Sequence, residues 1–520
     1  MVISIALLGF GFAGTLISLF KKWLIERANF LLPFLFLLCS ILISTTGRLS
    51  RIELIKFDSY ELFIDRIQFL KLAITYTIFF LPFFSGAMAL GIIYVKYISG
   101  IGYYYFADLF GAGTGSILII ILFWNFSPQK IPSLIALFPV FGGLLLIDGK
   151  SKVMIVISAL LAIACVLFTF FVPFGLNQSQ YKSLSYSLNL PKAKIEYEKN
   201  SPYGFIQVVS SPVMRFAPGL SLSYTGDVPT IKSIYRNGDS YAALLPWNIS
   251  DSSHILNYTT MTLPFLIAPF DTVLILDAKA GMEMTHAMSN GVVSITAVEP
   301  NTMITSLLKN EYARYTDSLL FRSEIEYINA EPRSFIAQEK KTYDLIIIPL
   351  LGAFGGNAGL QAIQENNLLT LEAFNKIWNS LKNDGVLSLS SWLDSPSRVP
   401  YKLAVMLAEG LENEGVNDPA DHIIAIKSWG TVTYCAKKSP LETEEIIHVK
   451  EFCEKNSFDL IVPGESFISQ DKRYNMDENQ GFDQHVITLL GSKRNDFIRA
   501  YDFRISPATN NSLTGNLKFR

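Results

Sequence analysis

The fold is decided by residues 273–288, which read VLILDAKAGMEMTHAM. The first four residues form a short apolar strand, and a turn then leads into helix-forming residues, which is how a nucleotide-binding strand passes to its helix. Such turns are usually rich in glycine, because a Cβ atom would keep the backbone away from a ligand. Two of the three positions where glycine is expected hold Asp277 and Lys279, and only Gly281 remains. The stretch predicts a Rossmann-like domain with an altered cofactor turn.

The alternation of strand and helix continues beyond this stretch. Apolar strands separated by helical segments indicate a parallel sheet that is covered on both faces. Two further segments lie close together near residue 430, and they predict an antiparallel pair that completes the sheet. The later strands are VVSITAVEPN (292–301), YDLIIIP (343–349) and GVLSLSSW (385–392), and the antiparallel pair is HIIAIKSW (422–429) and TVTYCAK (431–437).

Short alternating segments precede the Rossmann-like pattern. Residues 193–245 contain strand-like pieces interrupted by Pro, Gly and an Asn-Gly pair at 237–238, which favours a small β-domain. We therefore predict a multi-pass α-helical membrane domain followed by an α/β part. The predicted domains are a membrane domain at 1–178, a small β-domain at 185–262, a Rossmann-like methyltransferase fold at 263–440 and a C-terminal α/β extension at 441–520.

The membrane domain is predicted from long apolar runs at one end of the chain. A bilayer core of about 30 Å needs roughly 20 apolar residues as a helix. Lys21 and Lys22 end the first run where a signal peptide would be cleaved, so this run is interpreted as a span. Six transmembrane helices are expected, at 1–20, 29–47, 72–95, 109–129, 131–147 and 153–181.

The sequence leaves the orientation of this domain and the role of its one notable acid open. Basic residues divide evenly between the two sets of loops, so the side of the membrane that holds the soluble part is unresolved. Asp108 lies at the head of a span in which Gly111 and Gly115, four residues apart, suit close packing of helices. An acid at this depth is a candidate for handling a proton, an ion or a lipid headgroup, or else it caps the helix at the interface.

Composition excludes several classes of function. The formal net charge is −2 and no basic cluster occurs, so nucleic-acid binding is not indicated. The four cysteines and five histidines show no zinc-ligand spacing, and no metal site is expected. The expected partners are the lipid bilayer and other membrane subunits.

Two acids follow the turn in the order that a cofactor site requires. Glu299 ends the second strand, 18 residues after Gly281, where an acid binds ribose hydroxyls. Glu331 lies at the end of the expected third strand. Together with the altered turn, these acids favour an S-adenosylmethionine-type Rossmann domain.

Several stretches in consistent order resemble the spermidine synthase family, and most closely its membrane-fused branch. This family joins a small β-domain to a class I methyltransferase-like fold. The resemblance covers most of the chain. The stretches that carry it are LPFFSGAMAL, YYFADLFGAGTGS, VLILDAKAG, YDLIIIPLLGAF, ENNLLTLEAFNKIWNSLKNDGVL, NEGVNDPADHI and ISPATNN.

The resemblance implies a cofactor and a set of residues to hold it. Spermidine synthases bind decarboxylated S-adenosylmethionine and transfer its aminopropyl group to putrescine. Glu299 matches the ribose-binding acid of the family, and Glu331 matches its adenine-contacting Asp, one methylene longer. The candidate cofactor residues, for S-adenosylmethionine or its decarboxylated form, are Asp277, Gly281, Glu283, Glu299 and Glu331.

Departures from the family pattern weigh against catalysis. The family's catalytic Asp is expected near 349–352, where this chain has Pro-Leu-Leu-Gly, and no carboxylate occurs between Asp344 and Glu365. No catalytic residue is therefore assigned. Lys279 would place a cation beside the cofactor's sulfonium; it belongs either to a surface turn of a domain that no longer binds a ligand, or to a site that recruits an anion.

Three hypotheses for function follow. The first is a degenerate, membrane-anchored spermidine synthase-like protein without aminopropyltransferase activity, which serves as a subunit or scaffold in a membrane complex. The second is an active transferase that uses S-adenosylmethionine or its decarboxylated form on an amine or lipid acceptor. The third is a transporter with a regulatory domain, for which only Asp108 speaks. All three imply a multi-pass integral protein of the cytoplasmic membrane.

Overall fold

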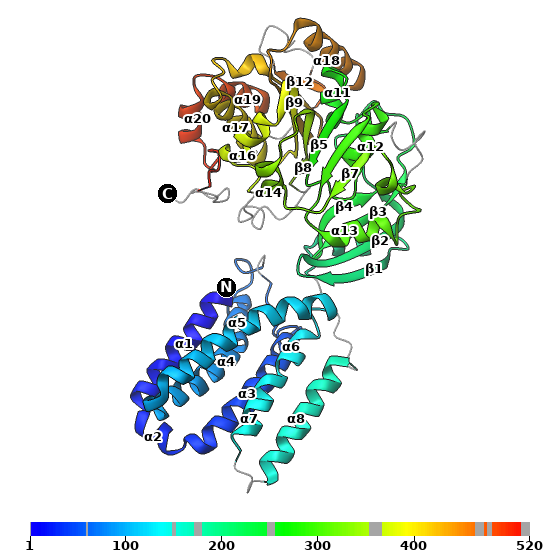
Figure 1. The fold of residues 1–520 in the computed structure, drawn as a ribbon. Coiled ribbons are helices and arrows are strands. Elements are labelled where there is room, and N and C mark those ends of the chain that lie inside the picture. Colours follow the sequence, from blue (N-terminus) through cyan, green and yellow to red (C-terminus); the bar gives the residue numbers. More distant parts are fainter. Residues whose placement is uncertain are drawn as a thin grey trace. The chain divides into compact units, whose positions relative to one another are not determined.

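The chain divides into two units, each of which is described by itself. The computed structural model describes residues 2–58, 61–147, 152–170, 179–246, 255–352, 367–462, 473–475 and 481–510. The helical unit comprises Met1–Ser179 with Lys199–Phe205, and the α/β unit comprises Gln180–Glu198 with Ile206–Arg520. Figure 1 shows the helices and strands of both units.

Four helical stretches in the described part of the helical unit are long and apolar enough to cross a membrane: Val2–Leu19, Ala28–Leu49, Ile67–Lys96 and Ile98–Asn125. The fifth expected span, 131–147, forms two shorter helices, and the sixth runs into residues 171–178, which lie outside the described residues. The count of six spans stays a prediction. The helices are α1 (Val2–Leu19), α2 (Lys21–Glu26), α3 (Ala28–Leu49), α4 (Ile67–Lys96), α5 (Ile101–Asn125), α6 (Ile131–Ile135), α7 (Leu137–Leu145) and α8 (Lys152–Phe170).

Small side chains let the apolar helices pack closely. Helix α4 packs against α1 and α3, around a core that includes Ala13, Ala28 and Ala89. A Cβ atom on Gly9 of α1 would lie 3.0 Å from the Phe83 Cβ of α4, so a larger residue at this position would push the two helices apart.

Asp108 does not cap its helix. Helix α5 begins at Ile101 with Gly100 as its N-cap, so Asp108 lies in the second turn. Its Oδ2 atom accepts a hydrogen bond of 2.8 Å from the Tyr94 hydroxyl of α4. The cap interpretation was wrong, because the helix starts earlier than the apolar run that predicted it.

The small β-domain is a four-stranded sheet in the order β1-β2-β3-β4. Asn237 and Gly238 both have positive φ, +54° and +82°, and they turn β3 back into β4 as their sequence predicts. A short helix, α9 (Ser183–Leu188), precedes the strands. The strands are β1 (Lys194–Ser201), β2 (Gly204–Arg215), β3 (Thr230–Arg236) and β4 (Asp239–Leu244).

The main sheet has eight strands in the order β12-β10-β11-β9-β8-β5-β6-β7. The strands from β7 to β9 are parallel, and β11, β10 and β12 follow as antiparallel neighbours. The predicted antiparallel pair is confirmed as β10 and β11. The strands are β5 (Thr272–Leu276), β6 (Ser294–Val298), β7 (Ile325–Ile328), β8 (Tyr343–Leu351), β9 (Leu381–Trp392), β10 (Ile423–Lys427), β11 (Thr431–Lys437) and β12 (Asp459–Val462).

Residues 381–389 differ from the sequence-based expectation. The strand was predicted to begin at Gly385, but β9 already begins at Leu381. Leu381 already pairs with Tyr343 of β8, so the ladder begins before the Asp-Gly pair. The preceding helix ends at Asn379.

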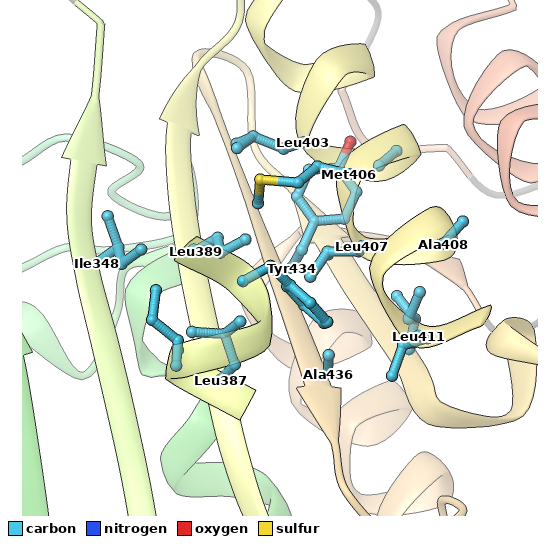
Figure 2. Packing of buried hydrophobic residues seen from close by; sticks show 14 of the residues in the cluster. Ile348, Leu387, Leu389, Leu403, Met406, Leu407, Ala408, Leu411, Tyr434 and Ala436 are labelled. Atoms are coloured by element: carbon cyan, nitrogen blue, oxygen red, sulfur yellow. The ribbon is translucent and has the colours of Figure 1, made fainter. Parts of the chain in front are cut away.

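Helices cover both faces of the main sheet, as parallel apolar strands require. One core joins the sheet to α14, α16, α17 and α19, and the other joins it to α11, α12, α13, α18 and the β-domain. Figure 2 shows Leu403, Met406 and Leu407 of α17 beside Leu389 of β9 and Tyr434 of β11. The helices are α11 (Leu263–Ile267), α12 (Met282–Ser289), α13 (Thr302–Lys309), α14 (Pro332–Gln338), α16 (Leu371–Asn379), α17 (Val399–Asn413), α18 (Thr443–Asn456), α19 (Phe482–Leu490) and α20 (Arg494–Ala500).

This architecture confirms the predicted fold class. A helical domain with long apolar helices is followed by a small β-domain and a Rossmann-like sheet of the methyltransferase and spermidine synthase type. The last 80 residues, predicted as an α/β extension, contribute β12 to the main sheet and the helices α18, α19 and α20.

Candidate functional site

The strand order places a topological switch point between β5 and β8. From β5 the chain continues to β6 and β7 on one side, and it then crosses to β8 and β9 on the other. In open sheets of this kind, ligands bind outside the carboxyl ends of the strands at the switch point. The turn 277–281 follows β5 at this position.

The backbone of this turn keeps the conformation of a glycine-rich turn. Asp277, Lys279 and Gly281 have φ values of +68°, +49° and +95°. These are the three positions where the sequence pattern expects glycine, and the left-handed region strains the two that carry a side chain. The turn therefore has left-handed backbone at all three positions, although two of them carry a side chain.

Lys279 is hydrogen-bonded to residues at the ends of three strands of the main sheet, β6, β7 and β8. Its backbone N–H donates to Glu299 Oε2 at 3.0 Å, and its carbonyl accepts from the Tyr327 hydroxyl at 3.0 Å. Its Nζ atom lies 3.5 Å from the Leu350 carbonyl of β8 and 3.7 Å from Asp277 Oδ2. The ammonium therefore reaches across the switch point from β5 to β8.

Glu299 is fully buried directly after β6, and its carboxylate is surrounded by protein donors. Oε1 accepts from the Tyr241 hydroxyl at 2.7 Å and from the Asn301 N–H at 2.8 Å, while Oε2 accepts from the Lys279 N–H. Burial, together with the charge of Asp277, raises the pKa of this carboxyl above its ordinary value. Glu299 joins the turn, β6 and the β-domain.

Glu283 is a second buried acid at the same turn. It lies in the first turn of α12, where a carboxylate suits the helix dipole, and it is 8% exposed. Burial raises the pKa of Glu283 to about 7, although the charge of Lys279 acts in the opposite direction. Glu283 therefore holds its proton to a higher pH than an exposed glutamate does.

Replacing Glu283 with glutamine is expected to stabilise the protein increasingly as pH rises from 4.5 to 8. The folded state holds this proton more tightly than the unfolded state, so wild-type stability from this group falls as pH rises through that window. The advantage of the variant should reach about 2–3 kcal/mol at pH 8. Thermal unfolding of both proteins in detergent at several pH values measures it.

The buried His286 makes stability fall as pH falls, which is opposite to the effect of Glu283. This contribution is present in both proteins and cancels when they are compared. Burial lowers the pKa of His286 to about 3, and this group destabilises both proteins as pH falls. An advantage that is the same at every pH would show that the Glu283 carboxyl titrates normally.

Glu331 has a structural partner. It is exposed at the N-cap of α14, and its Oε2 atom accepts from the Ser334 N–H at 2.7 Å. Strand β7 has already ended at Ile328. The contact explains an acid at this position as a helix cap, and its proposed contact with adenine stays a prediction.

No carboxylate stands at the carboxyl end of β8, among residues 349–352. Asp344 lies at the opposite end of this strand, where it accepts from the Thr272 N–H at 2.9 Å and pairs with Lys382 at 2.9 Å. The next acid in the sequence, Glu365, lies outside the described residues. His286 also faces elsewhere, with Nε2 at 2.9 Å from the Thr262 hydroxyl.

Three residues at or near this edge of the sheet were not predicted from the sequence. Tyr241 and Tyr327 bind Glu299 and the Lys279 carbonyl, respectively. Asp394 follows β9 and accepts from the Arg398 N–H at 2.9 Å; burial raises the pKa of this acid. An acid directly after a strand, in SWLDSPS, was the available signal for Asp394, whereas nothing local distinguishes the two tyrosines.

The described residues contain no group of three or more His, Cys, Asp or Glu side chains that could hold a metal ion.

The protein is similar to known proteins in its three-dimensional structure. No family model matches the sequence, and no curated protein matches it. A spermidine synthase in complex with the transition-state analogue AdoDATO is 14% identical, with 59% of this chain and 86% of that chain covered and a TM-score of 0.34. The spermidine synthase from Thermotoga maritima is also 14% identical, with 59% of this chain and 87% of that chain covered and a TM-score of 0.34.

A methyltransferase is also similar to part of the chain. The putative methyltransferase from Escherichia coli is 15% identical, with 38% of this chain and 91% of that chain covered and a TM-score of 0.24. At these values the fold assignment depends on the strand order and strand directions of the main sheet.

Proposed function

We propose that this protein is a membrane-anchored, spermidine synthase-like protein that does not transfer an aminopropyl group and serves as a subunit or scaffold in a membrane complex. The observation that carries the proposal is the end of β8. The described residues there, Pro349 to Gly352, hold no carboxylate, and Asp344 is engaged at the other end of the strand.

Aminopropyl transfer to putrescine needs a base at the reacting amine. The amine is protonated at neutral pH, so a positioned carboxylate must remove its proton as the new C–N bond forms. General-base assistance contributes about 10²–10⁴-fold to a rate. A cationic diamine also needs negative charge around it, and the end of β8 offers only apolar side chains and glycine.

The residues at the switch point do not fit an S-adenosylmethionine-type cofactor as they stand. The Glu299 carboxylate already accepts three hydrogen bonds from the protein. The Lys279 ammonium would add a like charge near a sulfonium, which disfavours binding. No catalytic step is therefore assigned to such a cofactor here.

The long apolar helices support the anchor. Four described helical stretches have the length and composition to cross a bilayer. We place the protein in the cytoplasmic membrane as a multi-pass protein, with other membrane subunits as its partners. Asp108 has a hydrogen-bond partner in Tyr94, which gives the transporter hypothesis no further support.

One observation favours a second candidate function, a transferase that uses S-adenosylmethionine or its decarboxylated form on an amine or lipid acceptor. The turn 277–281 keeps three left-handed residues, two of them at a cost in backbone strain. Strain of this kind is often retained where a backbone must meet a ligand. The two candidates differ in whether a nucleoside product is released.

The full-length protein, purified in detergent, is expected to release no methylthioadenosine from decarboxylated S-adenosylmethionine and putrescine. Chromatographic detection of the product measures this, with a known spermidine synthase as the positive control. Turnover that a Glu299→Ala variant abolishes would refute the proposal. Release of S-adenosylhomocysteine from S-adenosylmethionine with amines or lipids would favour the second candidate.

A further inference from the structure

Side chains of this protein lie where a nucleoside would bind at the switch point. An acid at the end of the second strand of a Rossmann sheet binds ribose hydroxyls. In this protein the Tyr241 hydroxyl donates to that acid, Glu299, at 2.7 Å. A phenol O–H supplies the same kind of donor as a ribose hydroxyl. Tyr241 thus occupies one hydrogen-bonding position of a ribose.

Tyr241 reaches Glu299 from the β-domain. It lies on β4, and the Arg236 guanidinium at the end of β3 stacks over its ring, 4.5 Å from the centroid. The Asn237–Gly238 turn joins these two strands. The hairpin therefore also supplies a group that packs on one face of the tyrosine ring.

The Lys279 side chain lies in a second part of the same nucleoside position, between the turn 277–281 and the end of β8. Its side chain is 24% exposed, and its ammonium spans from Asp277 to the Leu350 carbonyl. Glycine in its place would keep the left-handed backbone without strain and would leave the space beside β8 free. Both contacts depend on side chains alone, so both can be removed without altering the strands.

We propose that the Tyr241 hydroxyl and the Lys279 side chain keep a latent nucleoside site closed, and that removing both groups opens the site to an uncharged adenine nucleoside. This inference deepens the proposed function and rests on it in one respect, that the wild-type site is closed. The proposed function and this inference can fail separately. Turnover by the wild type tests the function, and nucleoside binding to a variant tests the inference.

The test is a calorimetric titration of the full-length protein in detergent with methylthioadenosine. The variant is Lys279→Gly with Tyr241→Phe. The matched control is Lys192→Gly with Tyr235→Phe. Lys192 is exposed and also has a positive φ, +53°, and the Tyr235 hydroxyl of β3 bonds to Ser187, so the control makes the same chemical changes elsewhere.

The double variant is expected to bind methylthioadenosine at least tenfold more tightly than the wild type and the control. Each single variant should fall between. A double variant that unfolds at the same temperature as the wild type and binds methylthioadenosine no more tightly would overturn the inference. If the double variant does not fold, the Lys279→Gly variant decides, because glycine relieves strain at that position. Tighter binding than the wild type would then support the inference, and equal binding would overturn it.

Discussion

Replacing Glu299 with alanine is expected to lower the free energy of unfolding of the α/β unit by about 2–4 kcal/mol. The carboxylate is fully buried and accepts from the Tyr241 hydroxyl and from two backbone N–H groups, those of Lys279 and Asn301. Alanine would leave all three donors without this acceptor, and each unsatisfied buried group costs about 1–3 kcal/mol. Relaxation and water entry would offset part of that sum.

Thermal unfolding in detergent measures the loss, with two reference proteins. Glu324→Ala removes a glutamate whose side chain accepts a hydrogen bond from its neighbour Ser323, and it should change stability by less than about 0.5 kcal/mol. Tyr241→Phe removes one of the three hydrogen bonds and should cost about 1 kcal/mol. A Glu299→Ala variant as stable as the wild type would show that this carboxylate does not hold the turn.

Replacing Asp483 with alanine is expected to destabilise the α/β unit by about 3–5 kcal/mol. Asp483 of α19 lies 3.1 Å from Lys427 Nζ of β10 and 2.7 Å from Arg473. The side chains of Asp483 and Lys427 are 3% and 2% exposed. Removing one partner leaves the other charge buried, which is far more costly than losing an exposed ion pair.

Asp496 provides the control for this prediction. Asp496 lies in the first turn of α20, and Asp483 lies in the first turn of α19, so both carboxylates interact with a helix dipole. Unlike Asp483, Asp496 is exposed. Asp496→Ala should cost less than about 0.5 kcal/mol. Similar losses for the two variants would mean that the buried pair adds little beyond the dipole.

The order of strands and helices could be predicted because each element carries its own periodicity. VLIL at 273–276 is apolar on both faces, as a central parallel strand must be, and it forms β5. The Asn237–Gly238 turn was predictable for the same local reason. The start of β9 was predicted too late, because Leu381 already pairs with β8 ahead of an irregular stretch at 382–385 that resembles a turn in the sequence.

The contacts of the site could not be predicted, because they join segments that are distant in the sequence. Glu299 was placed correctly at the end of its strand, but nothing near it shows that Tyr241 of the β-domain donates to it. Lys427 lies in a strand that the sequence predicted, yet its burial depends on Asp483 of α19. Glu331 was interpreted as a ligand contact, and only the start of α14 shows that it caps a helix.

The most direct test of the closed site is an experimental structure of the full-length protein determined with methylthioadenosine at millimolar concentration. We predict that the Tyr241 hydroxyl stays within hydrogen-bonding distance of Glu299, that Lys279 still reaches the end of β8, and that no nucleoside occupies the turn 277–281. A nucleoside whose ribose hydroxyls bind Glu299, with Tyr241 displaced, would contradict the account.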